Sequence, residues 1–129
     1  MVKIAIVEDE AAIAEMYKMK LQEVGYEVGV AANGKLGLEL CEKLKPDLVL
    51  LDLMMPEMSG PEMLAKMKAT DWGKKPLVML LTNLSQQESE IDPVKFPVEG
   101  YAVKAYYTPS QLLEKVNEIL KEHGKLPKE

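Results

Sequence analysis

The chain has 129 residues, 47% of them hydrophobic and 29% charged, and its formal net charge at pH 7 is −5. This length accommodates one globular domain with a single hydrophobic core. The net negative charge does not favour binding to nucleic acid. No apolar run approaches the roughly 20 residues that span a bilayer. We therefore expect neither direct binding to nucleic acid nor a membrane segment.

The cysteine content and the N-terminal sequence indicate the cellular compartment in which the chain is expected. Cys41 is the only cysteine, so no internal disulfide can form. Residues 1–10 show neither the charged and apolar regions of a secretory signal nor its cleavage site. A reducing cytoplasm is the expected location, with Cys41 as a small core residue rather than a redox sensor.

Short β-branched runs alternate along the chain with longer segments of helical periodicity. The expected strands are residues 2–7, 26–31, 47–52, 77–81 and 101–104. The expected helices are residues 11–24, 35–44 and 61–70, and a last helix that starts after a capping box at Thr108 and ends near residue 123. On the first helix, the inward stripe is expected to be Ile13, Met16, Tyr17, Lys20 and Val24.

Two segments are less regular. Pro93 and Pro97 would each remove a helical hydrogen bond, so the segment between residues 83 and 100 is expected to hold a short or irregular fourth helix at best. Residues 125–129 read as a polar tail that frays, which leaves residues 1–124 as the domain.

Five strand–helix units, with third and fourth strands apolar on both faces, predict a parallel sheet covered by helices on each side. The connections are expected to be right-handed, which gives a doubly wound α/β domain. In such sheets the functional crevice lies outside the carboxyl ends of the strands, where the strand order reverses.

Polar residues stand at four of those strand ends: Glu8, Asp9, Asp52, Thr82, Asn83 and Lys104. Two carboxylates about 4 Å apart repel by roughly 4 kcal/mol at an effective dielectric of about 20, so a cation is expected among them. Mg²⁺ favours such oxygen ligands. With a lysine and a threonine hydroxyl beside it, the site predicted is one for a phosphoryl group.

The chain resembles the receiver domains of two-component response regulators in four motifs, which follow in the family's order. These are EDE at residues 8–10, LLDLMMPEMSG at 50–60, LLTN at 80–83 and GYAVKA at 100–105. The resemblance covers essentially the whole chain. It implies a flavodoxin-like five-stranded sheet with strand order 2-1-3-4-5.

The resemblance also implies roles for the acidic residues. Asp52 would be the nucleophile that accepts a phosphoryl group from a phosphohistidine on a partner kinase. Asp9, Asp52 and the backbone carbonyl of Met54 would ligate Mg²⁺ directly, and Glu8 would do so through water.

The remaining motif residues would bind the phosphoryl group and change conformation when it is present. Thr82 and Lys104 would contact its oxygens. Tyr101 matches an aromatic whose rotation accompanies the threonine's inward move, although an ordinary packed tyrosine fits the sequence equally well. In the loop after Asp52, Pro56 and Gly60 are expected to shape the turn, with Gly60 able to take positive φ.

The chain departs from the family pattern at three positions. Ala105 follows Lys104 where receivers commonly carry a cis proline, which predicts a trans or locally strained bond. Met54 and Leu84 are apolar at positions that flank the water attacking the phosphoryl group. A long-lived phosphoryl state is therefore expected.

The implied function is signalling. The expected partners are a sensor histidine kinase or phosphotransfer protein and a downstream protein target, and phosphorylation-dependent homodimerisation stays open. The domain would catalyse only its own phosphorylation and dephosphorylation. One alternative, a haloacid-dehalogenase-like phosphatase, would need an aspartate two residues beyond Asp52, but Met54 stands there. The other alternative, an unphosphorylated pseudo-receiver or an engineered interaction scaffold, stays open.

Overall fold

A computed structural model describes residues 1–53, 55, 57–82, 98–103 and 107–126, without the side chains of Thr82 and Val103. The strands are β1 (Lys3–Val7), β2 (Glu27–Ala31), β3 (Leu48–Asp52), β4 (Leu77–Thr82) and β5 (Gly100–Val103). The helices are α1 (Ala11–Glu23), α2 (Gly34–Leu44), α3 (Gly60–Lys68), the 3₁₀ turn η1 (Trp72–Lys74) and α4 (Pro109–Glu122). None of the described helices is both long and apolar enough to cross a bilayer.

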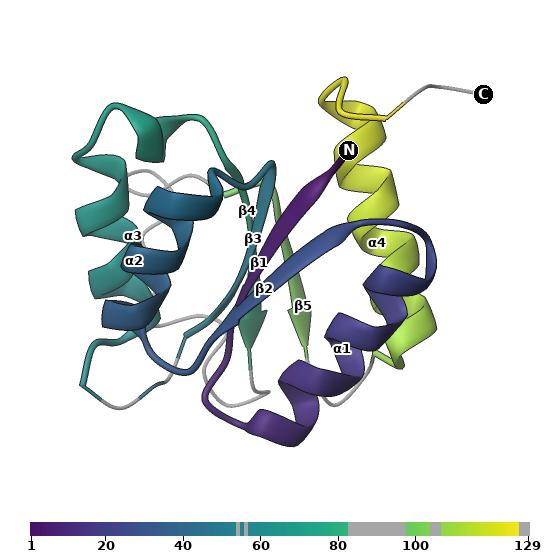
Figure 1. The fold of residues 1–129 in the computed structure, drawn as a ribbon, viewed down its shortest axis with the longest axis horizontal. Coiled ribbons are helices and arrows are strands. Elements are labelled where there is room, and N and C mark those ends of the chain that lie inside the picture. The colour runs from purple at the N-terminus through teal and green to yellow at the C-terminus, as the bar shows by residue number, and fades with distance from the viewer. Residues whose placement is uncertain (54, 56, 83–97, 104–106, 127–129) are drawn as a thin grey trace.

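The strands form one parallel sheet in the order β2-β1-β3-β4-β5, as predicted (Figure 1). Because β1 lies between β2 and β3, the chain moves from β1 to one side of the sheet for β2 and then to the other side for β3. The strand order therefore reverses between β1 and β3, which places the expected crevice at their carboxyl ends.

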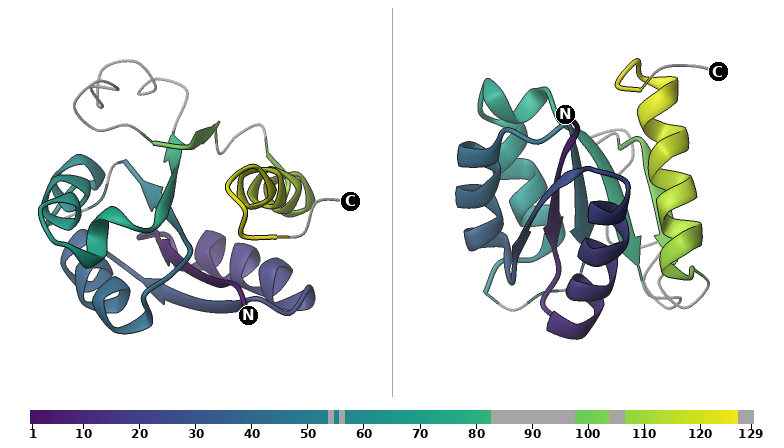
Figure 2. Two further views of the ribbon diagram at one scale, coloured as in Figure 1. Left: turned by 90° about the horizontal axis from the view of Figure 1, so that it is seen from above. Right: turned by 45° about the vertical axis from the view of Figure 1, so that its right-hand side comes forward.

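Helices cover both faces of the sheet. Figures 1 and 2 show α2 and α3 on one face and α1 and α4 on the other. Ile4 and Ile6 of β1 belong to the core beneath α1 and α4, whereas Ala5 and Val7 belong to the core beneath α2 and α3. A strand buried on both faces is apolar at every position, which explains why β1, β3 and β4 read as continuous apolar runs.

Capping boxes define where α3 and α4 begin. Thr108 accepts a hydrogen bond from the Gln111 amide at 3.2 Å, and the Gln111 side chain accepts one from the Thr108 amide at 2.9 Å. This is the capping box predicted for α4. Ser59 and Glu62 form the same arrangement at the start of α3, with Pro61 in its first turn.

The predicted inward face of α1 was largely wrong. The buried residues are Ala14, Tyr17 and Leu21, whereas the side chains of Met16 and Val24 are 47% and 49% exposed. The prediction followed the larger apolar residues, but a small alanine lets the helix lie close to the sheet and shifts its contact face. Of the predicted stripe, Tyr17 is fully buried and Ile13 is partly buried against the same core.

Two sequence predictions fall outside the described residues. They are the short or irregular helix between residues 83 and 100 and the conformation of the Lys104–Ala105 bond. In the C-terminal segment, the Lys125 ammonium lies 3.5 Å from the Asp47 carboxylate, and Leu126 packs against the core beneath α1 and α4.

Candidate functional site

The carboxyl ends of β1 and β3 carry the acidic residues, and backbone hydrogen bonds hold both ends in place. The Glu8 amide donates to the Ala31 carbonyl at 3.0 Å, which extends the β1–β2 ladder by one residue. The Leu53 amide donates to the Leu81 carbonyl at 3.2 Å, which does the same between β3 and β4. The residues at the crevice therefore stand on sheet backbone rather than on loose loops.

Glu8, Asp9 and Asp52 come together at this edge, where one carboxylate oxygen of each residue lies within 4.8 Å of one oxygen of each of the others. Glu8 and Asp52 are only 1% and 2% exposed, whereas Asp9 is exposed to solvent. The Glu8 side chain also accepts a hydrogen bond from the Glu10 amide at 3.1 Å. The three carboxylates thus form one cluster with a buried floor and an open rim.

Electrostatics make this cluster unfavourable by itself. Two carboxylates about 5 Å apart repel by about 3 kcal/mol at an effective dielectric of about 20. A hard divalent cation with oxygen ligands relieves such repulsion, and Mg²⁺ characteristically uses one or two carboxylates and retains several waters. The donor set fits this requirement, because Asp52 and Glu8 supply buried oxygens while Asp9 faces the solvent from which waters come.

The turn after β3 is held close to Asp52 by Gly60. The Gly60 amide donates to the Leu53 carbonyl at 3.0 Å. A Cβ atom at residue 60 would stand 2.4 Å from the Asp52 carbonyl oxygen, nearer than any side chain can approach. Gly60 is therefore needed for close packing of backbone on backbone directly beneath the acidic cluster.

The expectation that Gly60 provides a positive φ was wrong. Among the described residues of this loop, positive φ falls on Glu57, at 67°, while Gly60 begins α3. This conformation could not be predicted, because glutamate has no preference for the left-handed region. The capping box of Ser59 and Glu62 was readable in the sequence as S-x-x-E, although it was not predicted.

Two methionines of the loop after Asp52 pack against the core. Met55 and Met58 are partly buried against the core beneath α2 and α3. Gly34 allows close contact with Met58, since a Cβ atom at residue 34 would stand 2.8 Å from the Met58 carbonyl oxygen. The loop after Asp52 is thus anchored on the start of α2.

Several predicted site residues lie partly or wholly outside the described residues. Met54, Lys104 and the side chain of Thr82 are among these. The backbone of Thr82 ends β4 and pairs with Val103, the residue before Lys104. Tyr101 lies in β5 with its side chain 42% exposed.

Cys41 plays no part in this site. Its side chain is completely buried beneath α2 and α3. Burial raises the pKa of the Cys41 thiol to about 12, so the thiol stays protonated at neutral pH. A protonated, inaccessible thiol is a poor nucleophile, which confirms the prediction of a small core residue.

Comparison with known proteins identifies the family. The model of the response regulator receiver domain matches residues 4–117. Chemotaxis protein CheY of Thermotoga maritima is 32% identical over 120 residues, which cover 92% of this chain and 98% of that protein. The chain also spans 52% of the length of two longer transcriptional regulators.

Solved structures agree with this result. CheY4 of Vibrio cholerae has a TM-score of 0.84 at 29% identity, covering 93% of this chain and 99% of that one. TrrA of Thermotoga maritima, solved in complex with Mg²⁺-BeF, has a TM-score of 0.78 at 35% identity, covering 93% of this chain and 100% of that one. The chain therefore belongs to the response regulator receiver domains, the phosphoryl-accepting signalling domains of two-component systems.

Proposed function

We propose that this chain accepts a phosphoryl group on Asp52 from the phosphohistidine of a sensor histidine kinase or phosphotransfer protein. The observation that carries the proposal is the convergence of Asp52 with Glu8 and Asp9 within 4.8 Å. Membership of the receiver family supports it independently, and so does the Mg²⁺-BeF complex of TrrA.

The proposed transfer is a displacement at phosphorus. A carboxylate oxygen of Asp52 forms the new bond to phosphorus as the bond from phosphorus to the histidine nitrogen breaks, and the imidazole leaves with the electron pair. Burial of Asp52 on the end of β3 holds the nucleophile in one position. Asp52 therefore loses little orientational freedom when the phosphoryl donor docks.

Mg²⁺ is the proposed cofactor. Asp9, Asp52 and the backbone carbonyl of Met54 would hold it directly, and Glu8 would hold it through water. When bound, the ion neutralises charge that the carboxylates and the phosphoryl oxygens would otherwise place side by side. Glu8 and Asp9 would thus act as its anchors, since they directly follow β1 and are separate from the residue that reacts.

Thr82 and Lys104 are the proposed contacts for the phosphoryl oxygens, and Tyr101 is the proposed switch. The β4–β5 register supports this arrangement, because Thr82 pairs with Val103 and so stands next to the residue that precedes Lys104. The side chain of Tyr101 is exposed, so an inward rotation would carry it from the solvent towards the interior. Apolar Met54 and Leu84 continue to predict a slow loss of the phosphoryl group.

The output is proposed to be a protein contact that changes on phosphorylation. The chain carries a net charge of −5, which does not favour direct binding to DNA. The relatives that are transcriptional regulators are about twice as long. Signalling by this domain would then depend on its surface rather than on a nucleic-acid contact of its own.

The test is phosphorylation by acetyl phosphate in the presence of Mg²⁺, followed by intact mass. Wild type is expected to gain one phosphoryl group, and Asp52→Asn is expected to gain none because the amide is not a nucleophile. Asp71→Asn is the matched control, since it makes the same chemical change at an exposed aspartate that follows α3, and it should behave as wild type.

Two results would contradict the proposal. Equal modification of Asp52→Asn and wild type would place the phosphoryl group elsewhere. No modification of wild type, together with no NMR shift on addition of beryllofluoride and Mg²⁺, would instead indicate a pseudo-receiver scaffold.

A further inference from the structure

A cavity lies at the amino ends of β3 and β4, opposite the acidic cluster at the carboxyl ends of the strands. It opens between the segments that lead into β3 and β4, and its volume is about 480 Å³. Its apolar walls come from Trp72 of η1, from Pro46 two residues before β3 and from Pro76 directly before β4. A volume between about 300 and 1,000 Å³ with mainly apolar walls is typical of small-molecule sites.

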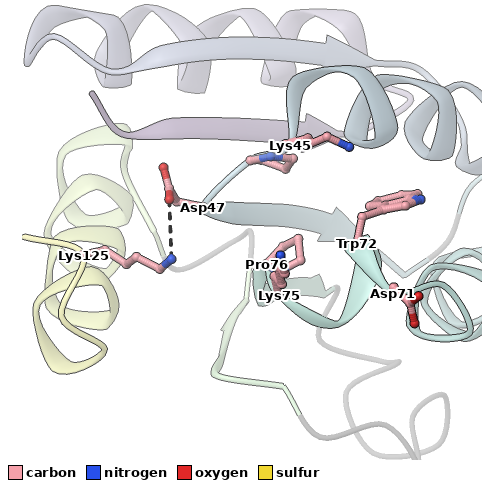
Figure 3. A pocket seen from close by; sticks show the side chains of 8 residues that line it. Lys45, Asp47, Asp71, Trp72, Lys75, Pro76 and Lys125 are labelled. Atoms are coloured by element: carbon pink, nitrogen blue, oxygen red, sulfur yellow. Dashed lines mark ion pairs between the residues drawn. The ribbon is translucent and has the colours of Figure 1, made fainter.

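Charged side chains surround these walls (Figure 3). Lys125 and Asp47 neutralise each other as an ion pair at 3.5 Å. Of the other charged lining residues, Lys45, Lys75 and Asp71, the two lysines form no ion pair with any described acidic residue. The cavity therefore carries a net positive charge on a chain whose net charge is −5.

Lys45 adopts a backbone conformation that is unfavourable for a lysine. It ends α2 with φ of 52°, in the left-handed region where glycine is the usual residue. A lysine is less stable in this conformation than glycine, because its Cβ atom lies too close to the following carbonyl oxygen. Its amide donates to the Cys41 carbonyl at 2.9 Å, which closes the left-handed cap of α2. Its ammonium makes only an exposed contact, with the Glu42 carbonyl at 3.3 Å.

We propose that this cavity binds a small aromatic anion. The ring would pack against the Trp72 indole between Pro46 and Pro76, since aromatic groups gain by stacking beyond their buried area. The anionic group would lie between the ammonium groups of Lys45 and Lys75. This site is separate from the one proposed for phosphorylation.

Trp72 is the only tryptophan, so its indole N–H resonance and its fluorescence report on this cavity alone. The probe is 1-anilinonaphthalene-8-sulfonate, and its uncharged counterpart is N-phenyl-1-naphthylamine. The sulfonate is expected to shift the Trp72 indole resonance saturably at a 1:1 ratio. The neutral probe should bind about five- to twentyfold more weakly, which corresponds to two partly exposed ion pairs.

Variants separate a binding role from a structural one. Lys75→Gln is expected to weaken sulfonate binding about two- to fivefold, and Lys45→Gly by a similar factor while raising the melting temperature, because glycine relieves the backbone strain. Lys35→Gln removes an exposed lysine at the other end of α2 and should leave binding unchanged.

Three outcomes would overturn the proposal. The first is an indole resonance that stays in place at millimolar sulfonate, which includes the case of binding elsewhere on the surface. The second is equal affinity for the charged and neutral probes. The third is unchanged affinity in both Lys45→Gly and Lys75→Gln.

Discussion

At the scale of single residues, two side chains adopt a backbone conformation that opposes their own preference. Lys45 and Glu57 are the described residues other than glycine with positive φ, at 52° and 67°. Glu57 lies in the loop that follows Asp52, and Lys45 lines the cavity at the amino ends of β3 and β4. Strained residues of this kind persist where surrounding structure over-determines them, and here both stand beside a proposed site.

Replacing Glu57 with glycine tests whether that strain is real. Glu57→Gly is expected to increase the free energy of unfolding by about 0.5 kcal/mol, since relief of the left-handed conformation slightly exceeds glycine's extra chain entropy. Glu39→Gly is the matched control on an exposed position of α2, where it should cost about 1 kcal/mol. Urea unfolding measures both, and an equal loss in the two variants would show that residue 57 is unstrained.

The candidate acidic residues were readable from the sequence, because each follows directly from the end of a strand. Glu8, Asp9 and Asp52 needed only correct strand ends to be placed at one edge. The conformation of Glu57 and the packing role of Gly60 were not readable. They depend on how the turn meets the Asp52 carbonyl, which is a contact that a linear sequence does not specify.

At the scale of elements, strand and helix positions were predicted to within one or two residues. The β-branched runs, the capping box at Thr108 and the glycine after α1 provided clear local signals. The face of α1 was not predicted, because size and polarity alone do not reveal that a small residue such as Ala14 faces the sheet. The turn η1 was also missed, since three residues carry no periodicity.

The junction of β3 and α3 gives a prediction at this scale. Gly60→Ala is expected to destabilise the fold by about 1–3 kcal/mol, because its Cβ would force backbone movement beside Asp52. The same movement should weaken phosphorylation of Asp52. Gly29→Ala is the control, since the Cβ there would meet only the flexible end of the Leu40 side chain.

Chemical unfolding and the acetyl phosphate assay measure the two effects on the junction. Gly29→Ala should keep phosphorylation and most of the stability. A Gly60→Ala variant as stable and as readily phosphorylated as Gly29→Ala would show that the close approach at residue 60 does not position the nucleophile.

At the scale of the whole molecule, the parallel sheet places unlike charges at the two ends of its strands. The carboxyl ends of the strands gather the acidic cluster, and the amino ends border a basic cavity. The sheet and its crevice were predictable, because parallel strands bring their carboxyl ends together. The cavity was not, because its walls come from Trp72 and from segments whose proximity only the folded chain determines.

The acidic cluster is also expected to change the free energy of unfolding of the whole domain. In the absence of divalent cations, carboxylate repulsion should make wild type less stable than Asp52→Asn. Mg²⁺ at ten times its dissociation constant should add about 1.4 kcal/mol to wild type, since an ion held only by the folded state stabilises by mass action. Asp52→Asn should gain much less, because it lacks one charged ligand.

The most direct measurement is therefore the melting temperature of wild type and Asp52→Asn across a Mg²⁺ titration, with sodium chloride added to match ionic strength. A higher starting value for the variant, together with a rise confined largely to wild type, is the result expected from a cation-binding carboxylate cluster. A wild-type melting temperature that several millimolar Mg²⁺ leaves unchanged, or one that rises equally in both proteins, would contradict it.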